Sequence, residues 1–366
     1  MAQTTLTPVM PESPGIVNSL TTGRLPTWAP WALLIGSWVV MSVVFMIVQA
    51  ANGGDFNIAA ALFFGTILFD VLIFAVAYLV EGARQARDRI VTSLVGTAFI
   101  IALLPLVSLM FTVVTSGVAR FDIQYFSSSM RNVVGEGGGA LHAITGTLLI
   151  TGMAALISVP VGLLTAIYLV EYGRGRLAKA ITFFVDVMTG IPSIVAGLFA
   201  YALFTLVTDD PGIRFGFGGS IALTLLMIPV VVRSSEEMLK IVPNELREAA
   251  YALGVPKWLT ILKVVIPTAI AGIATGVTLA IARVIGETAP LLIIAGFTTS
   301  MNYDLFNDRM MTLPVFVYNQ YAQPGTDVQV YLDRAWAGAL TLILIVMLLN
   351  LVARLIARIF SPKLGR

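Results

Sequence analysis

Long apolar runs separated by short polar segments form the main pattern of the chain. A helix needs roughly 20 mostly apolar residues to cross a bilayer, and eight runs reach that length. The expected spans cover residues 31–51, 57–80, 90–116, 142–170, 180–207, 219–240, 267–297 and 336–360. The pattern therefore predicts an all-α membrane protein with about eight transmembrane helices.

Four prolines interrupt these runs, namely Pro160, Pro192, Pro229 and Pro267. Proline removes a backbone donor and kinks a helix, and broken spans in transporters often line cavities. Proline is also common in ordinary membrane helices. Both interpretations stand at this point.

The basic residues predict the orientation. Eight spans place both termini on one side, and loops on the cytoplasmic side carry an excess of Lys and Arg. With both termini in the cytoplasm, sixteen of the 22 basic residues lie inside, five lie outside, and Arg283 falls within a span. We therefore expect a multi-pass protein of the cell (plasma or inner) membrane with cytoplasmic termini.

Composition narrows the possible functions. Hydrophobic residues make up 58% of the chain and charged residues 11%, whereas a soluble domain carries about a quarter charged residues. The net charge of +2 is too small to suggest nucleic acid, and His142 is the only histidine in a chain without cysteine. The sequence contains no GxxxxGK[ST] motif. We expect no bound metal or cofactor, and no ATP hydrolysis by this chain.

The runs also suggest a division into domains. Residues 1–30, rich in Thr, Ser and Pro and without a cleavable signal pattern, are expected to form a flexible cytoplasmic tail. Residues 31–80 resemble an added hairpin of two spans, joined to the rest by Gly82–Arg89. Residues 81–366 would then hold a core of six helices.

A polar, helix-forming loop lies between the sixth and seventh spans, at residues 241–267. Asn244 suits an N-cap, and one apolar stripe is spaced at i, i+3, i+4 and i+7. Gly254 supplies a left-handed stop, and Pro256 fits the first turn of a second helix. The stripe consists of Leu246, Ala249, Ala250 and Leu253.

The spacing of this loop resembles the cytoplasmic coupling loop of ABC-importer membrane subunits, which a separate ATPase grips. The pattern is Glu-Ala-Ala, three residues, Gly, nine residues, then aliphatic-x-aliphatic-Pro. The matching positions are Glu248, Ala249, Ala250, Gly254, Val264, Ile266 and Pro267. The alternative is an ordinary helical loop between two spans.

Charged residues near or within spans are the candidates for substrate contact. Arg283 and Glu287 are four residues apart, so on one helix face they can pair. A charge inside a span usually faces an interior or a water-filled path, and the planar guanidinium suits phosphate-type oxyanions. Arg233 can reach Glu236 or Glu237 at the cytoplasmic end of the sixth span. The alternatives are a packing pair for Arg283 and simple snorkelling for Arg233.

From about Gly138 to Ala357 the chain resembles phosphate ABC-transporter permeases of the PstA type. The resemblance is carried by Ile157–Tyr172, Thr189–Phe199, Ile228–Trp258 and Ala282–Leu292. It implies a six-span core paired with a second, PstC-like permease, two copies of an ATPase and an extracytoplasmic phosphate-binding protein. In that family, the positions matching Arg233, Glu236 and Arg283 are regarded as important for translocation. The hairpin at 31–80 departs from the pattern, and no role for it is implied.

We therefore expect a permease subunit of an ATP-driven importer of inorganic phosphate. Arg233 and Arg283 would neutralise the anion, Glu236 and Glu287 would hold those cations, and a partner ATPase would use ATP and Mg. Alternatives are an importer of another oxyanion, or a secondary transporter or channel without an ATPase. A membrane-embedded enzyme would need a catalytic set that the sequence does not offer.

Overall fold

The computed structural model describes residues 23, 25–52 and 56–360. Most of the expected tail, residues 1–22, lies outside the described residues. The chain divides into two compact units, residues 1–109 and 110–366, which are described separately below.

The first unit contains α1 (Ala29–Asn52), α2 (Ile58–Val80) and most of α3 (Ala83–Gly117). Polar side chains join these apolar helices. The Trp38 indole donates to Thr66 Oγ1 at 3.1 Å between α1 and α2, and the Ser93 hydroxyl donates to the Asp70 carboxylate between α3 and α2. Such bonds hold membrane helices together because lipid provides no hydrophobic force between them.

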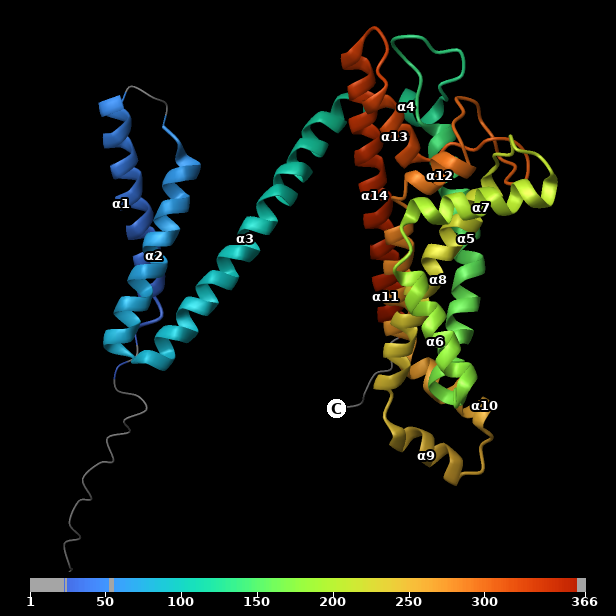
Figure 1. Cartoon of the computed structure of the whole chain (residues 1–366), viewed down its shortest axis with the longest axis horizontal. Coiled ribbons are helices and arrows are strands. Elements are labelled where there is room, and N and C mark those ends of the chain that lie inside the picture. Colours follow the sequence, from blue (N-terminus) through green and yellow to red (C-terminus); the bar gives the residue numbers. More distant parts are fainter. Residues whose placement is uncertain (1–22, 24, 53–55, 361–366) are drawn as a thin grey trace, which may run out of the picture. The chain divides into compact units, whose positions relative to one another are not determined.

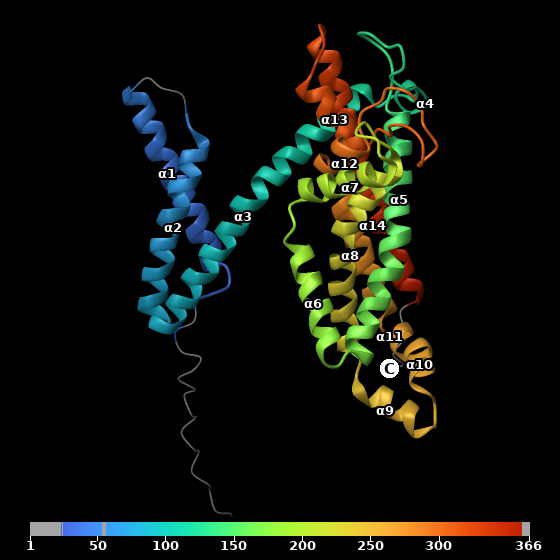
Figure 2. The same cartoon turned by 45° about the vertical axis from the view of Figure 1, so that its right-hand side comes forward.

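The second unit is built around four helices that run side by side: α5 (Leu141–Ile167), α8 (Gly216–Ile241), α11 (Ile266–Val284) and α14 (Val328–Phe360) (Figures 1 and 2). Small residues allow close approach. A Cβ on Gly162 of α5 would lie 2.7 Å from a Val231 methyl on α8, and one on Gly276 of α11 would lie 2.5 Å from Ser234 Oγ.

Ten shorter helical elements complete the described part of this unit. They are η1 (Val118–Arg120), α4 (Ile123–Ser127), the π-helical turn η2 (Tyr168–Tyr172), α6 (Arg176–Thr189), α7 (Ser193–Thr208), α9 (Asn244–Ala252), α10 (Lys257–Thr260), the π-helical turn η3 (Ile261–Val265), α12 (Ala289–Ile294) and α13 (Leu313–Ala322). Figure 1 shows α9 beyond the ends of α6 and α8, at the opposite end of the unit from α4 and α13.

The helical, multi-span fold expected from the sequence is confirmed. Among the residues that the structure describes, seven helices are long and apolar enough to cross a membrane, or eight when one bent pair counts as a span. Six of the expected spans correspond to helices, four of them to within about three residues at each end, whereas α3 and α14 begin seven and eight residues before the expected spans 90–116 and 336–360.

Two expected spans are wrong in detail. Residues 180–207 do not form one straight helix, because α6 and α7 meet at an angle of 109° around Gly190–Pro192. Proline cannot donate the backbone bond that would continue α6. The helix expected over 267–297 ends at Val284, and α12 starts only after Thr288, directly before Pro290.

Candidate functional site

The turn after α9 has the conformation that the sequence predicts. Gly254 has φ +75°, its N–H donates to Tyr251 O at 2.9 Å, and the Val255 N–H donates to Ala250 O at 3.1 Å. These two bonds form a Schellman motif, in which the left-handed residue is usually glycine. The chain therefore turns sharply between α9 and α10.

Two smaller expectations for this loop are wrong. Asn244 is the first helical residue of α9 and not its N-cap, which is Pro243. The Asn244 side-chain oxygen instead lies 3.4 Å from the Arg247 guanidinium. Pro256 precedes α10 and acts as its N-cap, because α10 begins at Lys257.

The apolar stripe of α9 is largely uncovered within this chain. Leu246 and Ala249 are exposed, and Leu253 is 84% exposed. Only Ala250 is buried. An exposed apolar face next to polar residues is typical of a surface that another protein covers.

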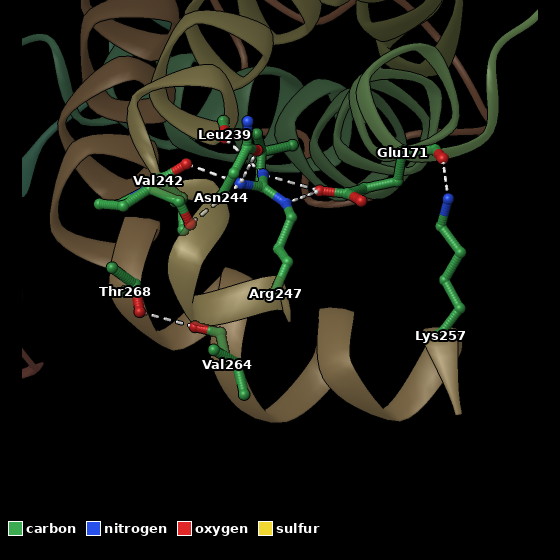
Figure 3. Close-up of polar contacts among 9 residues, drawn as sticks. Glu171, Leu239, Val242, Asn244, Arg247, Lys257, Val264 and Thr268 are labelled. Atoms are coloured by element: carbon green, nitrogen blue, oxygen red, sulfur yellow. Dashed lines mark hydrogen bonds and ion pairs between the residues drawn. The ribbon is translucent and has the colours of Figure 1, made fainter. Parts of the chain in front are cut away.

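Arg247 fixes α9 to the membrane helices (Figure 3). Its guanidinium donates to Glu171 Oε1 at 2.8 and 3.0 Å, to Leu239 O at 3.0 Å and to Val242 O at 2.6 Å. Leu239 and Val242 end α8, so the arginine also satisfies carbonyls that a helix terminus leaves unpaired. The side chains of Arg247 and Glu171 are only 12% and 5% exposed, which makes this a buried ion pair.

Lys257 makes a second attachment to the same place. Its ammonium donates to the Glu171 carbonyl and lies 4.8 Å from the centroid of the Tyr172 ring. In the sequence, Arg247 and Lys257 are two of the sixteen basic residues expected in the cytoplasm, and nothing in the local pattern marks Glu171. The cluster at the end of α5 thus holds both sides of the turn at Gly254.

A cavity of about 210 Å³ lies beside α8 and contains the first pair of candidate residues. Arg283 and Glu287 both line it, together with Met188, Thr189, Ile191, Ser193, Leu226, Pro229 and Val230. The bend between α6 and α7 contributes Ile191 and Ser193. The cavity therefore combines a cation, a carboxylate and two hydroxyl groups with an apolar wall.

The expected pairing of Arg283 with Glu287 is wrong. Within the described part of the chain, neither side chain forms an ion pair or hydrogen bond, because α11 ends at Val284 and Glu287 is no longer on its face. Arg283 is also exposed on this chain and not enclosed by it. Its guanidinium is thus available to a ligand or a partner.

Arg233 does form the pair that its spacing predicts. It donates to Glu236 Oε2 at 2.8 Å, and Glu236 also accepts from Lys240 at 2.7 Å. Glu237, the other expected partner, is exposed and makes no such bond. A carboxylate that sequence analysis missed, Asp186 of α6, binds the second edge of Arg233.

The loop beyond α12 is held by its own side chains. The Asn302 amide donates to Asn307 O at 2.8 Å, while the Asp304 carboxylate accepts from the Asn307 amide at 2.6 Å and from the Phe306 N–H at 2.8 Å. These bonds, that from the Asn307 side chain foremost, lower the pKa of Asp304. The loop thus presents an ordered, ionised surface.

The sequence model of the family "binding-protein-dependent transport system inner membrane component" matches residues 158–366. This range contains most of the helix bundle of the second unit and the exposed α9. The fold is also similar to a chain in the crystal structure of a bacterial alginate ABC transporter in complex with an alginate pentasaccharide-bound periplasmic protein. The TM-score is 0.55 at 15% identity, over 76% of this chain and 97% of that chain.

Two relatives are much more similar in sequence. Phosphate transport system permease protein PstA 1 of Mycobacterium tuberculosis (strain CDC 1551 / Oshkosh) is 46% identical over 75% of this chain and 89% of its own length. PstA of Pasteurella multocida (strain Pm70) is 40% identical over 76% of this chain and 96% of its own length. The chain therefore belongs to the PstA family of transport permeases and is a multi-pass inner membrane protein.

Proposed function

We propose that this chain is a permease subunit of an ATP-driven importer of inorganic phosphate. The observation that carries the proposal is the 46% identity to PstA 1 of M. tuberculosis over 89% of that protein. The same substrate is supported by the exposed guanidinium of Arg283, which lines a cavity together with the hydroxyl groups of Thr189 and Ser193, because all three groups can donate hydrogen bonds to phosphate.

The proposed machine has four kinds of component. A second, PstC-like permease lies against this chain and completes the path, which accounts for a cavity cation that this chain leaves exposed. A pair of ATPase subunits binds ATP and Mg and hydrolyses ATP, and an extracytoplasmic binding protein delivers phosphate. Both termini of this chain, like α9, lie in the cytoplasm.

Coupling to the ATPase runs through α9 in this proposal. The residues that face the ATPase are Leu246, Glu248 and Ala249, with Ala250 and Gly254 shaping the helix and its turn. A push on α9 reaches α5 and α8 through Arg247, because its guanidinium binds Glu171 and the carbonyls of Leu239 and Val242.

The anion passes two cations on its way. In the cavity, Arg283 binds the phosphate. Glu287 lines the same space, and because its negative charge repels the anion it limits how tightly the phosphate is held. Arg233 is the second cation, and Glu236 holds it in place. A site of intermediate strength is required because the anion must also leave.

The test is uptake of labelled phosphate in cells depleted of this chain and complemented with wild type, Arg283→Ala or Arg131→Ala. Arg131 is an exposed arginine outside the cavity and serves as the matched control. Wild type and Arg131→Ala should restore uptake and Arg283→Ala should not, at equal membrane levels.

Other results identify the rivals. If depletion leaves energised phosphate uptake unchanged and no redundant system is present, the substrate assignment is wrong, and uptake of other oxyanions is measured next. If the chain alone transports phosphate without an ATPase, it is a secondary transporter or channel. Equal restoration by Arg283→Ala would remove Arg283 from the path.

A further inference from the structure

The ion pair between Asp186 and Arg233 lies just beyond one end of the cavity. Thr189 and Val230 line the cavity. Asp186 precedes Thr189 by three residues on α6, and Arg233 follows Val230 by three residues on α8, so both lie about one helical turn from the lining. Both are displaced toward the ends of α6 and α8 that lie near α9 (Figure 1).

The two carboxylates on Arg233 have different positions in the fold. Glu236 belongs to the same helix and is also bound by Lys240, so its contact with Arg233 is local. Asp186 comes from α6, and its carboxylate is the group that joins α6 to α8 at this level. Asp186 is exposed, whereas Glu236 is buried. The bridge between the two helices is therefore the more accessible of the two contacts.

A carboxylate and a phosphate present the same feature to a guanidinium, namely two oxygens that accept N–H bonds in one plane. The edge of Arg233 that Asp186 occupies is thus a site for an oxyanion that is filled by the protein itself. An exposed ion pair is weak, so an anion that reaches Arg233 can replace the carboxylate.

We propose that Asp186 is a substitute anion that closes the path at the α9 end of the cavity. The inference rests on the proposed function and extends it. The transported oxyanion leaves the cavity, takes the place of Asp186 on Arg233, and so releases α6 from α8. Glu236 remains bound throughout and keeps the site from holding the anion too tightly. When the anion has left, Asp186 returns to Arg233.

The test uses the absence of cysteine from this chain. Ser193→Cys places a single thiol in the cavity lining, at the start of α7. In inside-out vesicles containing the assembled transporter, a membrane-impermeant thiol reagent is added from the cytoplasmic face, and labelling is read on this chain after its isolation. The rate reports how often the cavity opens to that face.

Three variants are compared in the Ser193→Cys background. Asp186→Asn removes the charge, Asp186→Glu keeps it, and Glu237→Gln is the matched control that removes a carboxylate without an ion pair. We expect Asp186→Asn to raise the labelling rate two- to fivefold. Losing an exposed ion pair changes the equilibrium between the closed and open states of the cavity by about this factor. Asp186→Glu and Glu237→Gln should label like the parent. Asp186→Ser repeats the measurement if Asp186→Asn does not reach the membrane.

Equal labelling rates in Asp186→Asn and Glu237→Gln would overturn the proposal. Uptake measured on the same variants separates the two levels of inference. A raised labelling rate in a transporter that carries no phosphate would leave the closing role of Asp186 intact and reject the substrate. Unchanged labelling in a phosphate transporter would reject Asp186 alone. Inorganic phosphate added to the parent should raise its labelling toward that of Asp186→Asn.

Discussion

At the scale of single residues, Arg247 connects the α9 helix to the membrane helices. Its guanidinium contacts one carboxylate and two carbonyls that lie on α8 or at the end of α5. The pair with Glu171 is almost fully buried. Removing one partner of a buried ion pair leaves an uncompensated charge, which is far more costly than losing a surface pair.

We expect Arg247→Ala to destabilise the protein by about 3–5 kcal/mol because Glu171 is left buried and unpaired. The double variant Arg247→Ala/Glu171→Gln should regain part of this loss, since no unpaired charge remains. The midpoint of unfolding in mild detergent measures both, with exposed Arg174→Ala as the control. An unchanged midpoint for Arg247→Ala would mean that the contact contributes nothing to stability.

Gly254 offers a second prediction at this scale. A Cβ there meets nothing within 4 Å in this chain, and the positive φ alone makes other residues costly by roughly 1–2 kcal/mol, least for Asn. If an ATPase lies against the turn, side-chain size decides instead. We expect Gly254→Asp to abolish energised uptake without affecting insertion, and Gly254→Asn to transport less than Gly254→Ala. Better transport by Gly254→Asn would show that backbone strain is the cause.

The residue scale also shows what a sequence can reveal about the site. Gly254 was predictable because its left-handed conformation depends on a local pattern of helix, stop and proline. The pair of Arg233 and Glu236 was predictable because helical spacing alone brings them together. Asp186 and Glu171 were not, since they lie 47 and 76 residues from their partners and only the tertiary fold joins them. Arg283 and Glu287 were misjudged because a helix was assumed to continue past Val284.

At the scale of the elements, close helix contacts depend on particular glycines. On α5, a Cβ at Gly146 would collide with the carbonyl oxygen of Met311, whereas a Cβ at Gly152 would meet nothing within 4 Å. Both glycines lie inside the same helix, where alanine is the better helix former by about 1 kcal/mol. Replacing each of them by alanine therefore separates the effect of packing on stability from that of helix propensity.

We expect Gly146→Ala to destabilise the protein by about 1–3 kcal/mol, because a backbone atom cannot move aside as a flexible side chain can. Gly152→Ala should be neutral or stabilising. Thermal unfolding of the purified chain in detergent compares the two. Equal effects would indicate that α5 and the segment before α13 are free to separate.

Element boundaries were predictable where an apolar run met a clear polar end, as in α2 or α8. They were wrong where the run continued across a break. The residues of α6 and α7 are apolar on both sides of Pro192, so hydropathy gave one span where the structure has two helices at 109°. Hydropathy counts apolar residues, and the direction of the chain is set by the backbone bonds that proline cannot make.

At the scale of the whole molecule, this bent pair decides the number of membrane crossings. If α6 and α7 together cross the membrane, Asp210 lies outside and both termini are on one side. If they form a re-entrant loop, seven crossings remain. The basic residues favour the first arrangement.

We expect an impermeant thiol reagent to label Asp210→Cys in intact cells and not Glu248→Cys, both of which are exposed positions in a chain without native cysteine. Permeabilised cells should label both and serve as the control. Labelling of Glu248→Cys and not of Asp210→Cys in intact cells would contradict the even number of crossings, because a re-entrant α6–α7 pair reverses the sides of both positions.

The N-terminal hairpin gives the last prediction. The M. tuberculosis relative matches over 89% of its own length yet pairs with only 75% of this chain, and the family model matches residues 158–366. We expect a chain that begins at residue 81 to insert and to sustain energised uptake. Loss of uptake at normal membrane levels would make α1 and α2 part of the transport machinery.

Two π-helical turns lie next to the α9–α10 loop, namely η2 after α5 and η3 after α10. In η2 the Gly173 N–H bonds to Tyr168 O, and in η3 the Ile266 N–H bonds to Ile261 O, so each turn holds one residue more than an α-turn. Such a turn can pass its extra residue along a helix and rotate the segment beyond it by about 100°. Only η3 is continuous with the loop, whereas η2 at the end of α5 meets it through the contacts of Glu171 with Arg247 and Lys257. We expect movement of the loop to rotate α11 through η3 as well as to shift it.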